Sequence, residues 1–537
     1  MADRTRDFAS TADNPSSRAV SEKQDDSDLS APSSPPLGRV EDNVRADGKR
    51  ELTEDMCYDK LAYNWPTSKK WMYLCSVGLI QIAMNYNTSV YPNVVPQLVE
   101  HFPGLSMQGA RTGQMIYLIF YSFGCELWAP WSEEFGRWPF LQLSETLINI
   151  FTLPAALAPN FGSILAGRAL AGLSTAGGSV TLGLIADLYQ PEDQQFPLAF
   201  IVLASCIGTS IGGVIGGPIE RFLDWRWNFW IQLIFNGTAQ AIHFFMPESR
   251  ATIIMDKEAK RRRKTGEDPN IYGPNELKKP RISMKDIFKI WSRPWIMLLT
   301  EPIVTCLSLL SGFSDALIFT FLESFTPVYA QWNFGILATA WAFIPINAAY
   351  FIAYFSYYPW FWRDQHVRRQ KGRDYYLPER RLKWLLWTAP LEPIGLFGFA
   401  WTTKASFHWI VPMIFSAMVG IANYTIYFSS VDYMVAAYGV YSASATGGNA
   451  WARDFFAGIS AMYAAPLYHN LGTSPNPGVN YATTLLAALS CLIVAPIYVF
   501  YWFGPQIRDR SKFAKTLAVD REETGGKRVN EADNLPA

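Results

Sequence analysis

Residues 195–220 read QFPLAFIVLASCIGTSIGGVIGGPIE, a run in which Glu220 is the one charged residue. A helix of about 20 apolar residues is long enough to cross a hydrocarbon core of roughly 30 Å. Similar runs recur between Trp71 and Phe503, and 50% of the 537 residues are hydrophobic. The mean hydropathy is +0.04 in spite of long polar ends. This pattern predicts an integral membrane protein built from helices.

The spacing of the apolar runs predicts twelve transmembrane helices in two six-helix halves, an all-α membrane fold. The first six are expected near 71–93, 111–131, 138–158, 161–189, 195–220 and 226–247. The second six are expected near 295–325, 333–360, 382–402, 407–434, 440–466 and 480–504. Two joined halves of this kind are typical of secondary transporters, whose substrate site lies at the midplane between the repeats.

The polar segments predict the division of the chain and its orientation. Residues 1–66 are rich in Ser, Asp, Arg and Pro, a composition that favours a disordered tail. The linker at 248–293 contains the basic run Lys260–Lys264, and the loop at 363–383 is also basic. The positive-inside rule then places the linker and both termini in the cytoplasm. The expected parts are a tail (1–66), a half (67–247), a linker (248–293), a half (294–504) and a tail (505–537).

Composition argues against several classes of function. The net charge is zero, so there is no overall basic field for nucleic acid. The six cysteines and five histidines show no spacing typical of a metal site. No metalloprotease motif and no phosphate-binding loop is found, so we expect neither an enzyme nor a cofactor.

The loop after the second expected helix carries the most specific motif in the chain. Residues 128–139 read WAPWSEEFGRWP, with glycine for a tight turn and an acid and a cation for the helix ends. The stretch resembles the major facilitator signature between helices two and three, in the form found in fungal drug and polyamine exporters. Residues 247–254 and 438–445 are similar to the same branch, and the resemblance covers roughly residues 60–510.

The resemblance implies a cytoplasmic latch that opens and closes during alternating access. Its expected members are Glu133, Gly136, Arg137 and, at the end of the fourth helix, Asp187. Ala129 replaces a usual glycine, and Glu134 and Trp138 replace usual cations. The alternative is that the charged members are simple helix-end charges.

Arg168 lies inside an apolar segment among small residues, in the sequence LAGRALAG at 165–172. An intramembrane cation is costly and by default indicates function. The segment resembles the fourth-helix motif that is linked to proton transfer in proton-coupled members of the family. The alternative is an arginine near the outer end whose side chain snorkels to the interface.

The fifth expected helix is rich in glycine, which lets two helices approach closely. Small residues are expected along one of its faces, and the pattern resembles the motif of antiporters rather than importers. Its glycines are Gly208, Gly212, Gly213, Gly216 and Gly217.

Charged residues inside the second half are candidates for proton or substrate coupling, because an ion at the bilayer centre costs several kcal/mol. We expect Asp315, Asp432 and Arg453, together with Arg168, to form the coupling set. Glu301 and Glu323 fall near helix ends and are expected to be interfacial. Asp454 follows Arg453 directly, and adjacent side chains point about 100° apart on a helix, so a pair between them is not assumed.

Polar and aromatic residues in apolar helices are candidates for substrate contact. The amides either bind a substrate or hold helices together, and inward aromatic rings suit flat or cationic molecules. The selected residues are Gln81, Asn85, Tyr121, Tyr350 and Tyr424, with Tyr117 and Trp341 as further inward candidates.

These observations predict a secondary transporter that exports amphipathic organic compounds by alternating access, coupled to protons. The expected partners are the lipid bilayer, a small molecule and protons, and the chain is expected to be a monomer in the plasma membrane. Two alternatives remain open. One is a narrow carrier of polyamines or small organic acids, and the other is a transporter-like nutrient sensor.

Overall fold

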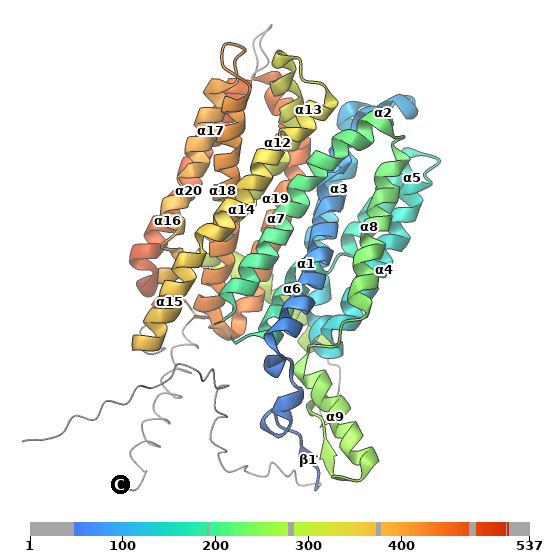
Figure 1. Cartoon of the computed structure of the whole chain (residues 1–537), viewed down its shortest axis with the longest axis vertical. Coiled ribbons are helices and arrows are strands. Elements are labelled where there is room, and N and C mark those ends of the chain that lie inside the picture. The colour runs from blue at the N-terminus through green and yellow to red at the C-terminus, as the bar shows by residue number, and fades with distance from the viewer. Residues whose placement is uncertain are drawn as a thin grey trace, which may run out of the picture.

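The computed structural model describes residues 48–190, 193–277, 284–371, 377–471, 479–511 and 513–514. Within these ranges, each of the twelve expected spans corresponds to one helix or to consecutive helices. The helices run roughly side by side (Figure 1). We call the end of the bundle that carries β1 and α9 the tail end, and the end that carries α2 and α13 the far end.

The first half contains six spans. They are α1 (Thr67–Ser89), α3 (Met107–Phe135), α4 (Arg137–Ala156), α5 and α6 (Phe161–Leu173 and Gly177–Leu188), α7 (Gln195–Phe222) and α8 (Arg226–Phe244). At the far end, η3 (Tyr91–Val94) and α2 (Val95–His101) join α1 to α3. The fourth span is divided because Ser144 Oγ accepts from the amide of Ala176 and donates to the carbonyl of Ser174, which satisfies the broken backbone.

The second half contains the remaining spans, several of them in pieces. They are α11 and α12 (Met284–Thr300 and Pro302–Tyr329), α13 to α15 (Ile336–Trp341, Ile344–Ser356 and Tyr358–Lys371), α16 and α17 (Leu385–Thr388 and Leu391–Thr402), α18 (Ile410–Tyr438), α19 (Ser442–Asn470) and α20 (Val479–Arg510). Short 3-10 turns η4 (Ala330–Trp332), η6 (Pro378–Leu382) and η7 (Gly439–Tyr441) connect them. Glu301 is extended between α11 and α12 because Pro302 follows it.

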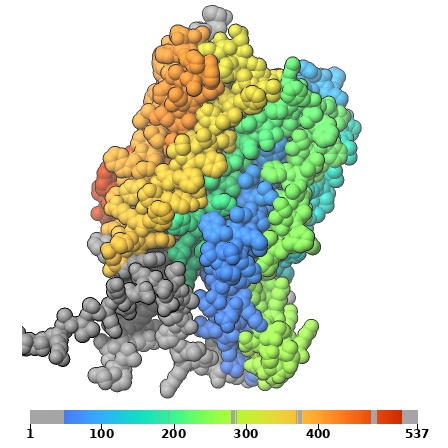
Figure 2. Space-filling model, in the orientation of Figure 1, coloured from blue at the N-terminus to red at the C-terminus, as the bar shows by residue number. Residues whose placement is uncertain are grey.

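The two halves meet mainly along α3 and α7 of the first half. Helix α3 packs against α19, and α7 packs against α13 and α14. On the face shown in Figure 2, atoms of the two halves lie side by side along the length of the bundle. Aromatic residues extend this contact at the tail end, where the partly buried Phe196 of α7 lies against Tyr358 and the buried Phe361 of α15.

Five helical stretches of the described residues are long and apolar enough, taken alone, to cross a membrane. They are Gln195–Phe222, Pro302–Trp332, Ile336–Val367, Ile410–Tyr438 and Asn480–Arg510. The other spans are divided, as α5 and α6 are, or contain buried polar groups, such as Glu126 in α3, Glu145 in α4 and Arg453 in α19. Those polar groups face protein rather than the outer surface, as expected for ionisable residues in membrane helices.

A small folded unit lies at the tail end, built from the chain before α1 and from the linker. Strand β1 (Arg50–Glu51) pairs in parallel with β2 (Ile271–Tyr272), and η1 (Asp55–Lys60) lies on α9 (Ala251–Thr265) (Figure 1). The short helices η2 (Ala62–Asn64) and α10 (Pro274–Leu277) complete it. Its apolar core consists of Leu52, Cys57, Leu61, Met255, Ala259 and Ile271.

The expectation of disorder over residues 1–66 is therefore wrong for residues 48–66. The apolar residues of this segment are too sparse to fold alone, but they complete a core with the linker, which sequence composition does not reveal. Residues 1–47 lie outside the described residues. The C-terminal tail expected from residue 505 also begins later, because α20 continues to Arg510, where Arg508 bonds Glu379 at 2.8 Å.

Candidate functional site

At the tail end, Arg137 and Asp187 form the centre of the predicted latch. Arg137 Nε donates to Asp187 Oδ2 at 3.0 Å, and Arg137 Nη1 donates to Ser132 Oγ at 2.7 Å. Gly183 makes room for the guanidinium, because a Cβ atom there would lie 2.3 Å from Nη2. Glu133 is a more distant partner, because its Oε1 lies 3.9 Å from Arg137 Nη2 and its side chain is 34% exposed. The structure thus brings the four predicted latch residues together, with Asp187 rather than Glu133 as the close partner.

The start of the linker holds the latch from outside the motif. Glu248 accepts from the amides of Arg137 and Trp138, at 2.9 and 3.2 Å, and so caps the N-terminus of α4. Gly136 has φ +110°, and a Cβ atom there would lie 2.4 Å from the Glu248 carboxylate. The glycine of the motif is therefore required both for its backbone conformation and for the approach of this cap.

Arg250 gives Asp187 a second cation. Its Nη1 lies 3.0 Å from Asp187 Oδ1, so each oxygen of the carboxylate has a guanidinium. Burial works against the charge of Arg250, but the charge and hydrogen bond of Asp187 and the charge of Glu133 together hold the pKa of Arg250 above its ordinary value. Tyr63, just before α1, donates to the carbonyl of Ala186 at 2.8 Å. Burial, and then the charge of Asp187, raise the pKa of Tyr63.

A similar pair occupies the second half. Arg381, which lies between α15 and α16, bonds Asp432 of α18. Arg381 and Asp432 are 51 positions apart, and Arg137 and Asp187 are 50 apart, as internal repeats predict. Gln195 of α7 donates to Asp432 Oδ2 at 3.1 Å and so ties the first half to this pair.

The prediction that Asp432 joins the coupling set does not fit these contacts. Asp432 lies two turns from the tail end of α18, and its hydrogen bonds within the described residues go to Arg381 and Gln195. Asp432 was selected because it is an acid inside an otherwise apolar helix. Its partner comes from a loop far along the chain, which the sequence of α18 does not indicate.

Asp315 and Arg453, by contrast, do come together, on helices α12 and α19 of the second half. Arg453 Nε of α19 lies 3.9 Å from Asp315 Oδ2 of α12, and its guanidinium lies over the ring of Tyr427 at 4.0 Å. Arg453 Nη2 also donates to Asp454 Oδ1 at 3.3 Å. The neighbouring residues thus do contact each other, because the long arginine side chain bends back across the helix surface.

Arg168 forms a separate site near the far end. Its guanidinium lies between the rings of Tyr91 and Tyr117, 4.2 and 4.6 Å from their centroids, and its Nε donates to the carbonyl of Gly113 at 2.7 Å. The side chain is 2% exposed, so the alternative of snorkelling to an interface is wrong. Contact with aromatic faces stabilises a desolvated cation by roughly 2 kcal/mol. The structure does not place Arg168 in contact with the other members of the coupling set.

The sequence profile of the Major Facilitator Superfamily matches residues 77–453. The chain belongs to this superfamily. It is therefore a membrane transporter and not an enzyme, and the twelve-helix fold predicted above is confirmed.

Known fungal transporters of this superfamily resemble the chain over most of its length. The transporter paaT of Penicillium rubens is 30% identical over 456 residues, 84% of this chain and 81% of that one. The transporter oryN of Aspergillus oryzae is 29% identical over 522 residues, 94% of this chain and 97% of that one. The efflux pump FUB11 of Gibberella moniliformis is 28% identical over 459 residues, 84% of this chain and 76% of that one.

Solved structures support the same fold. The proton:xylose symporter XylE, bound to 6-bromo-6-deoxy-D-glucose, matches with a TM-score of 0.57 at 16% identity, over 81% of this chain and 97% of that one. The human organic anion transporter MFSD10 matches with a TM-score of 0.53 at 15% identity, over 81% of this chain and all of that one. At these identities the likeness establishes the major facilitator fold alone.

The glycines of α7 in this transporter face two different partners. Gly208, Gly212 and Gly216 form one row, where added Cβ atoms would meet α1 and η3. Gly213 and Gly217 form another row toward the second half, and a Cβ at Gly217 would lie 2.3 Å from the Cβ of Ala340. The single small face predicted from the sequence is thus two faces, one for packing within a half and one for contact between halves.

Some of the predicted substrate-contact residues are hydrogen-bonded within the protein, and others have buried polar atoms without a partner among the described residues. Asn85 Nδ2 donates to the carbonyl of Gln81 at 2.9 Å, and Tyr424 donates to the carbonyl of Ala199 at 2.9 Å, across the two halves. Within the described residues, Gln81 Oε1 and the hydroxyl of Tyr121 are buried without a hydrogen-bond partner. Trp341 is 53% exposed and does not point inward as expected.

Tyr350 begins a chain of hydrogen bonds that sequence reasoning missed. Its hydroxyl donates to Asn423 Oδ1 at 3.2 Å, and Asn423 Nδ2 donates to Ser314 Oγ at 3.2 Å. Ser314 in turn bonds Glu392, which also accepts from Ser490 Oγ at 3.0 Å. The acid Glu392 in an apolar run was a visible signal, but its two hydrogen-bond partners come from two other helices, α12 and α20.

Two further buried acids were not among the predicted sites. Glu126 of α3 and Glu145 of α4 are 3% and 0% exposed. In the described part of the chain, Glu126 Oε1 and both carboxyl oxygens of Glu145 lack a hydrogen-bond partner. Each interrupts an apolar run, so the same signal that selected Asp315 could have selected them.

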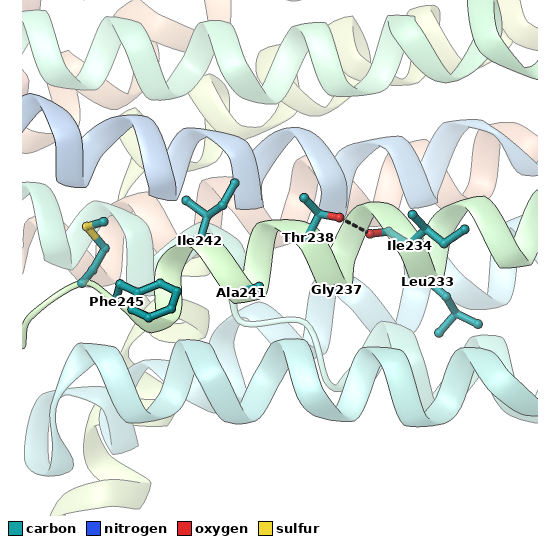
Figure 3. Close-up of a pocket in the computed structure, with 8 residues that line it drawn as sticks. Leu233, Ile234, Gly237, Thr238, Ala241, Ile242 and Phe245 are labelled. Carbon is teal, nitrogen blue, oxygen red and sulfur yellow. Dashed lines mark hydrogen bonds between the residues drawn. The ribbon is translucent and has the colours of Figure 1, made fainter.

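A hollow on the outer surface of α8 is not a candidate site. It is lined mostly by apolar residues of α8 and of the turn after it, among them Leu233, Ile234, Ile242 and Phe245 (Figure 3). The hydroxyl of Thr238 is already bonded to the carbonyl of Ile234 at 2.7 Å. With no free polar group to orient a solute, this surface suits lipid chains.

Proposed function

We propose that this transporter exports amphipathic organic compounds in exchange for protons, by alternating exposure of a site between its halves. The single observation that carries the proposal is the contact of Arg453 with Asp315 and Asp454 between α12 and α19. Ionisable groups buried in membrane helices are retained where ions or protons move. The similarity to proteins named as efflux pumps supports the outward direction.

The cycle follows from where the halves touch. At the tail end, Gln195 bonds Asp432, and at the far end Arg111 Nε lies 2.8 Å from Glu323 Oε2. Each contact joins a helix of one half to a helix of the other. Export requires that they break alternately, with protonation of a central carboxyl favouring release of the substrate outside.

Orientation and location are part of the same proposal. The basic side chains of α9, such as Arg262 and Arg263, lie at the tail end. The positive-inside rule then places this end and both termini in the cytoplasm. We propose that the chain works as a monomer in the plasma membrane, because both contacts between halves lie within one chain.

The experiment is drug transport into sealed vesicles that contain the purified protein, with and without a pH gradient. Uptake should require an acidic lumen and should stop when a protonophore removes the gradient. Asp315→Asn should abolish the dependence on the gradient, and Glu100→Gln, an exposed acid on α2, should change nothing. Equal transport without any gradient, or an Asp315→Asn protein with a full response, would remove the proposal.

A further inference from the structure

Unpartnered hydrogen-bond acceptors gather between the two halves. Among the described residues, the buried atoms without a partner include Glu126 Oε1, Asp454 Oδ2, Gln81 Oε1 and the hydroxyl of Tyr121. The four residues are between 1% and 4% exposed. A buried acceptor without a donor costs about 1–3 kcal/mol, and more when it is charged. Four such atoms in one region indicate a ligand that brings donors.

The backbone is shaped to admit these side chains. A Cβ atom on Gly447 of α19 would lie 2.6 Å from the Glu126 carboxylate, so the acid of α3 reaches the backbone of the opposite half. Asp454 is seven residues further along α19, two turns away on the same face. The charge of Asp454 acts on Glu126 and on Tyr121, so the three groups lie within electrostatic reach.

The acceptors of the first half lie beside a break in the fourth span. A Cβ atom on Gly177, the first residue of α6, would lie 3.1 Å from Gln81 Oε1 and 3.6 Å from the hydroxyl of Tyr121. Met84 Sδ would be nearer still, at 2.6 Å, so the small residue at the break lets these side chains pack close to the backbone of α6. The predicted substrate contacts Gln81 and Tyr121 thus share one location.

The acidic side chains of this region outnumber the basic ones. Asp315, Asp454 and Glu126 can carry three negative charges, and Arg453 carries one positive charge. Arg453 contacts Asp454 through Oδ1 and Asp315 through Oδ2, which leaves Asp454 Oδ2 and Glu126 without a cation. Arg453 Nε is one of the unpartnered donors among the described residues, and it already lies 3.9 Å from Asp315.

We infer that the group formed by Glu126, Asp454, Gln81 and Tyr121 binds the protonated amine of an organic cation. This inference rests on the proposed transport function and names its substrate class. An ammonium group supplies N–H donors and the missing positive charge, and the ring of Tyr121 offers a face to the organic part. A carboxylate ligand would meet two acids and would be repelled.

Binding of three compounds with one scaffold to the purified full-length protein tests the inference. Tyramine, tyrosol and 4-hydroxyphenylacetate carry an amine, a hydroxyl and a carboxylate on the same ring and chain, and spermidine adds a flexible amine. We measure the rise in melting temperature on addition of each compound, without any gradient. Tyramine, spermidine or both should raise it, and tyrosol and 4-hydroxyphenylacetate should not. Glu126→Gln and Asp454→Asn should each weaken amine binding at least tenfold, and Glu100→Gln should leave it unchanged.

Since the two acid variants keep the shape of the side chains, their melting temperatures without ligand check that they fold. Gly447→Ala offers a second route, because its methyl group displaces the Glu126 carboxylate and should also weaken amine binding. Failure of both amines to bind, preference for the carboxylate, or unchanged affinity in the acid variants would overturn the inference. Selective amine binding without gradient-driven transport would instead contradict the proposed function alone, so the two failures are distinguishable.

Discussion

Arg137 Nε lies 3.0 Å from Asp187 Oδ2, and the two side chains are 3% and 7% exposed. The second oxygen of Asp187 is bonded by Arg250 from the linker, also at 3.0 Å. The carboxylate thus connects the start of α4, the end of α6 and the chain that leaves α8. Any movement that separates these three segments must break a buried ion pair.

Replacement of Asp187 by Asn should destabilise the protein strongly. It leaves two guanidinium groups near a neutral amide, and loss of one member of a buried pair costs about 3–5 kcal/mol. Glu133→Gln is the matched control, because Glu133 lies 3.9 Å from Arg137 and is 34% exposed. Glu133→Gln should lower the free energy of unfolding by about 1 kcal/mol or less. Thermal melting of the purified proteins checks this, and equal effects of the two variants would show that the loop acid matters as much as Asp187.

Gly136→Ala should prevent assembly of the tail end. The residue has φ +110°, and its new methyl group would lie 2.4 Å from Glu248, which caps α4. The matched control is Gly237→Ala in α8, where an added Cβ meets nothing within 4 Å. Yields of monodisperse protein should fall sharply for the first variant and stay normal for the second. A well-folded Gly136→Ala protein would show that the cap adapts.

The helical spans and the latch loop could be predicted from the sequence, because the hydropathy of a segment and the glycines at its turns are local signals. The spans around α7 and α18 and the latch residues Gly136 and Arg137 could be read directly from their own segments. Folding of residues 48–66 was missed, because its core depends on Met255 and Ile271, which lie some 200 positions away. Composition reports what a segment can bury alone, and not what a distant segment offers it.

The candidate site was less predictable because each charge acquires its role from a partner. Asp432 and Asp315 look alike as single acids in apolar helices, but one bonds Arg381 at the tail end and the other faces Arg453. Trp341 and Tyr350 are both aromatic residues in apolar segments, although Trp341 is exposed and Tyr350 is buried. Helical periodicity was too weak to separate inward from outward faces in helices that are apolar all round.

A larger side chain at Gly217 should open the far end. Gly217 of α7 lies against Ala340 of α13, and an added Cβ would be 2.3 Å from the Cβ of Ala340. Gly217→Val should therefore push the halves apart where Arg111 and Glu323 also meet. Spin labels at the exposed positions Glu100 and Lys404 should show a longer distance in this variant.

Gly237→Val is the control for that experiment, because position 237 faces open space. It should leave the distance distribution unchanged. If Gly217→Val gives the wild-type distribution, the far-end contact is not a constraint on the position of the halves.

Acid should release the N-terminal segment from α9. Hydrogen bonds from Arg261, and then from Lys60 and Arg262, hold the pKa of Glu258 well below its ordinary value of 4.5. A carboxyl with a lowered pKa in the folded state stabilises that state above its ordinary pKa, and the contribution is lost as the pH falls below it. Docking of η1 should thus be constant between about pH 7 and 5 and should weaken progressively at lower pH.

Spin labels at the exposed positions Tyr58 and Lys257 report the docking, since one lies on η1 and the other on α9. Their distance distribution should be narrow at neutral pH and should broaden below about pH 4.5. Glu258→Gln should broaden it at every pH, because the neutral amide loses the charge-assisted bond to Lys60, the one of its three cations that lies on η1. A hydrogen bond to a charged group contributes roughly 1.5–3 kcal/mol. Glu267→Gln alters an acid that is 51% exposed and pairs with Arg261 alone among the described cations, so it should keep the wild-type distribution and its pH dependence. If Glu258→Gln stays narrow at neutral pH, the apolar contacts of Leu52 and Leu61 are sufficient for docking and the ion pairs are not needed.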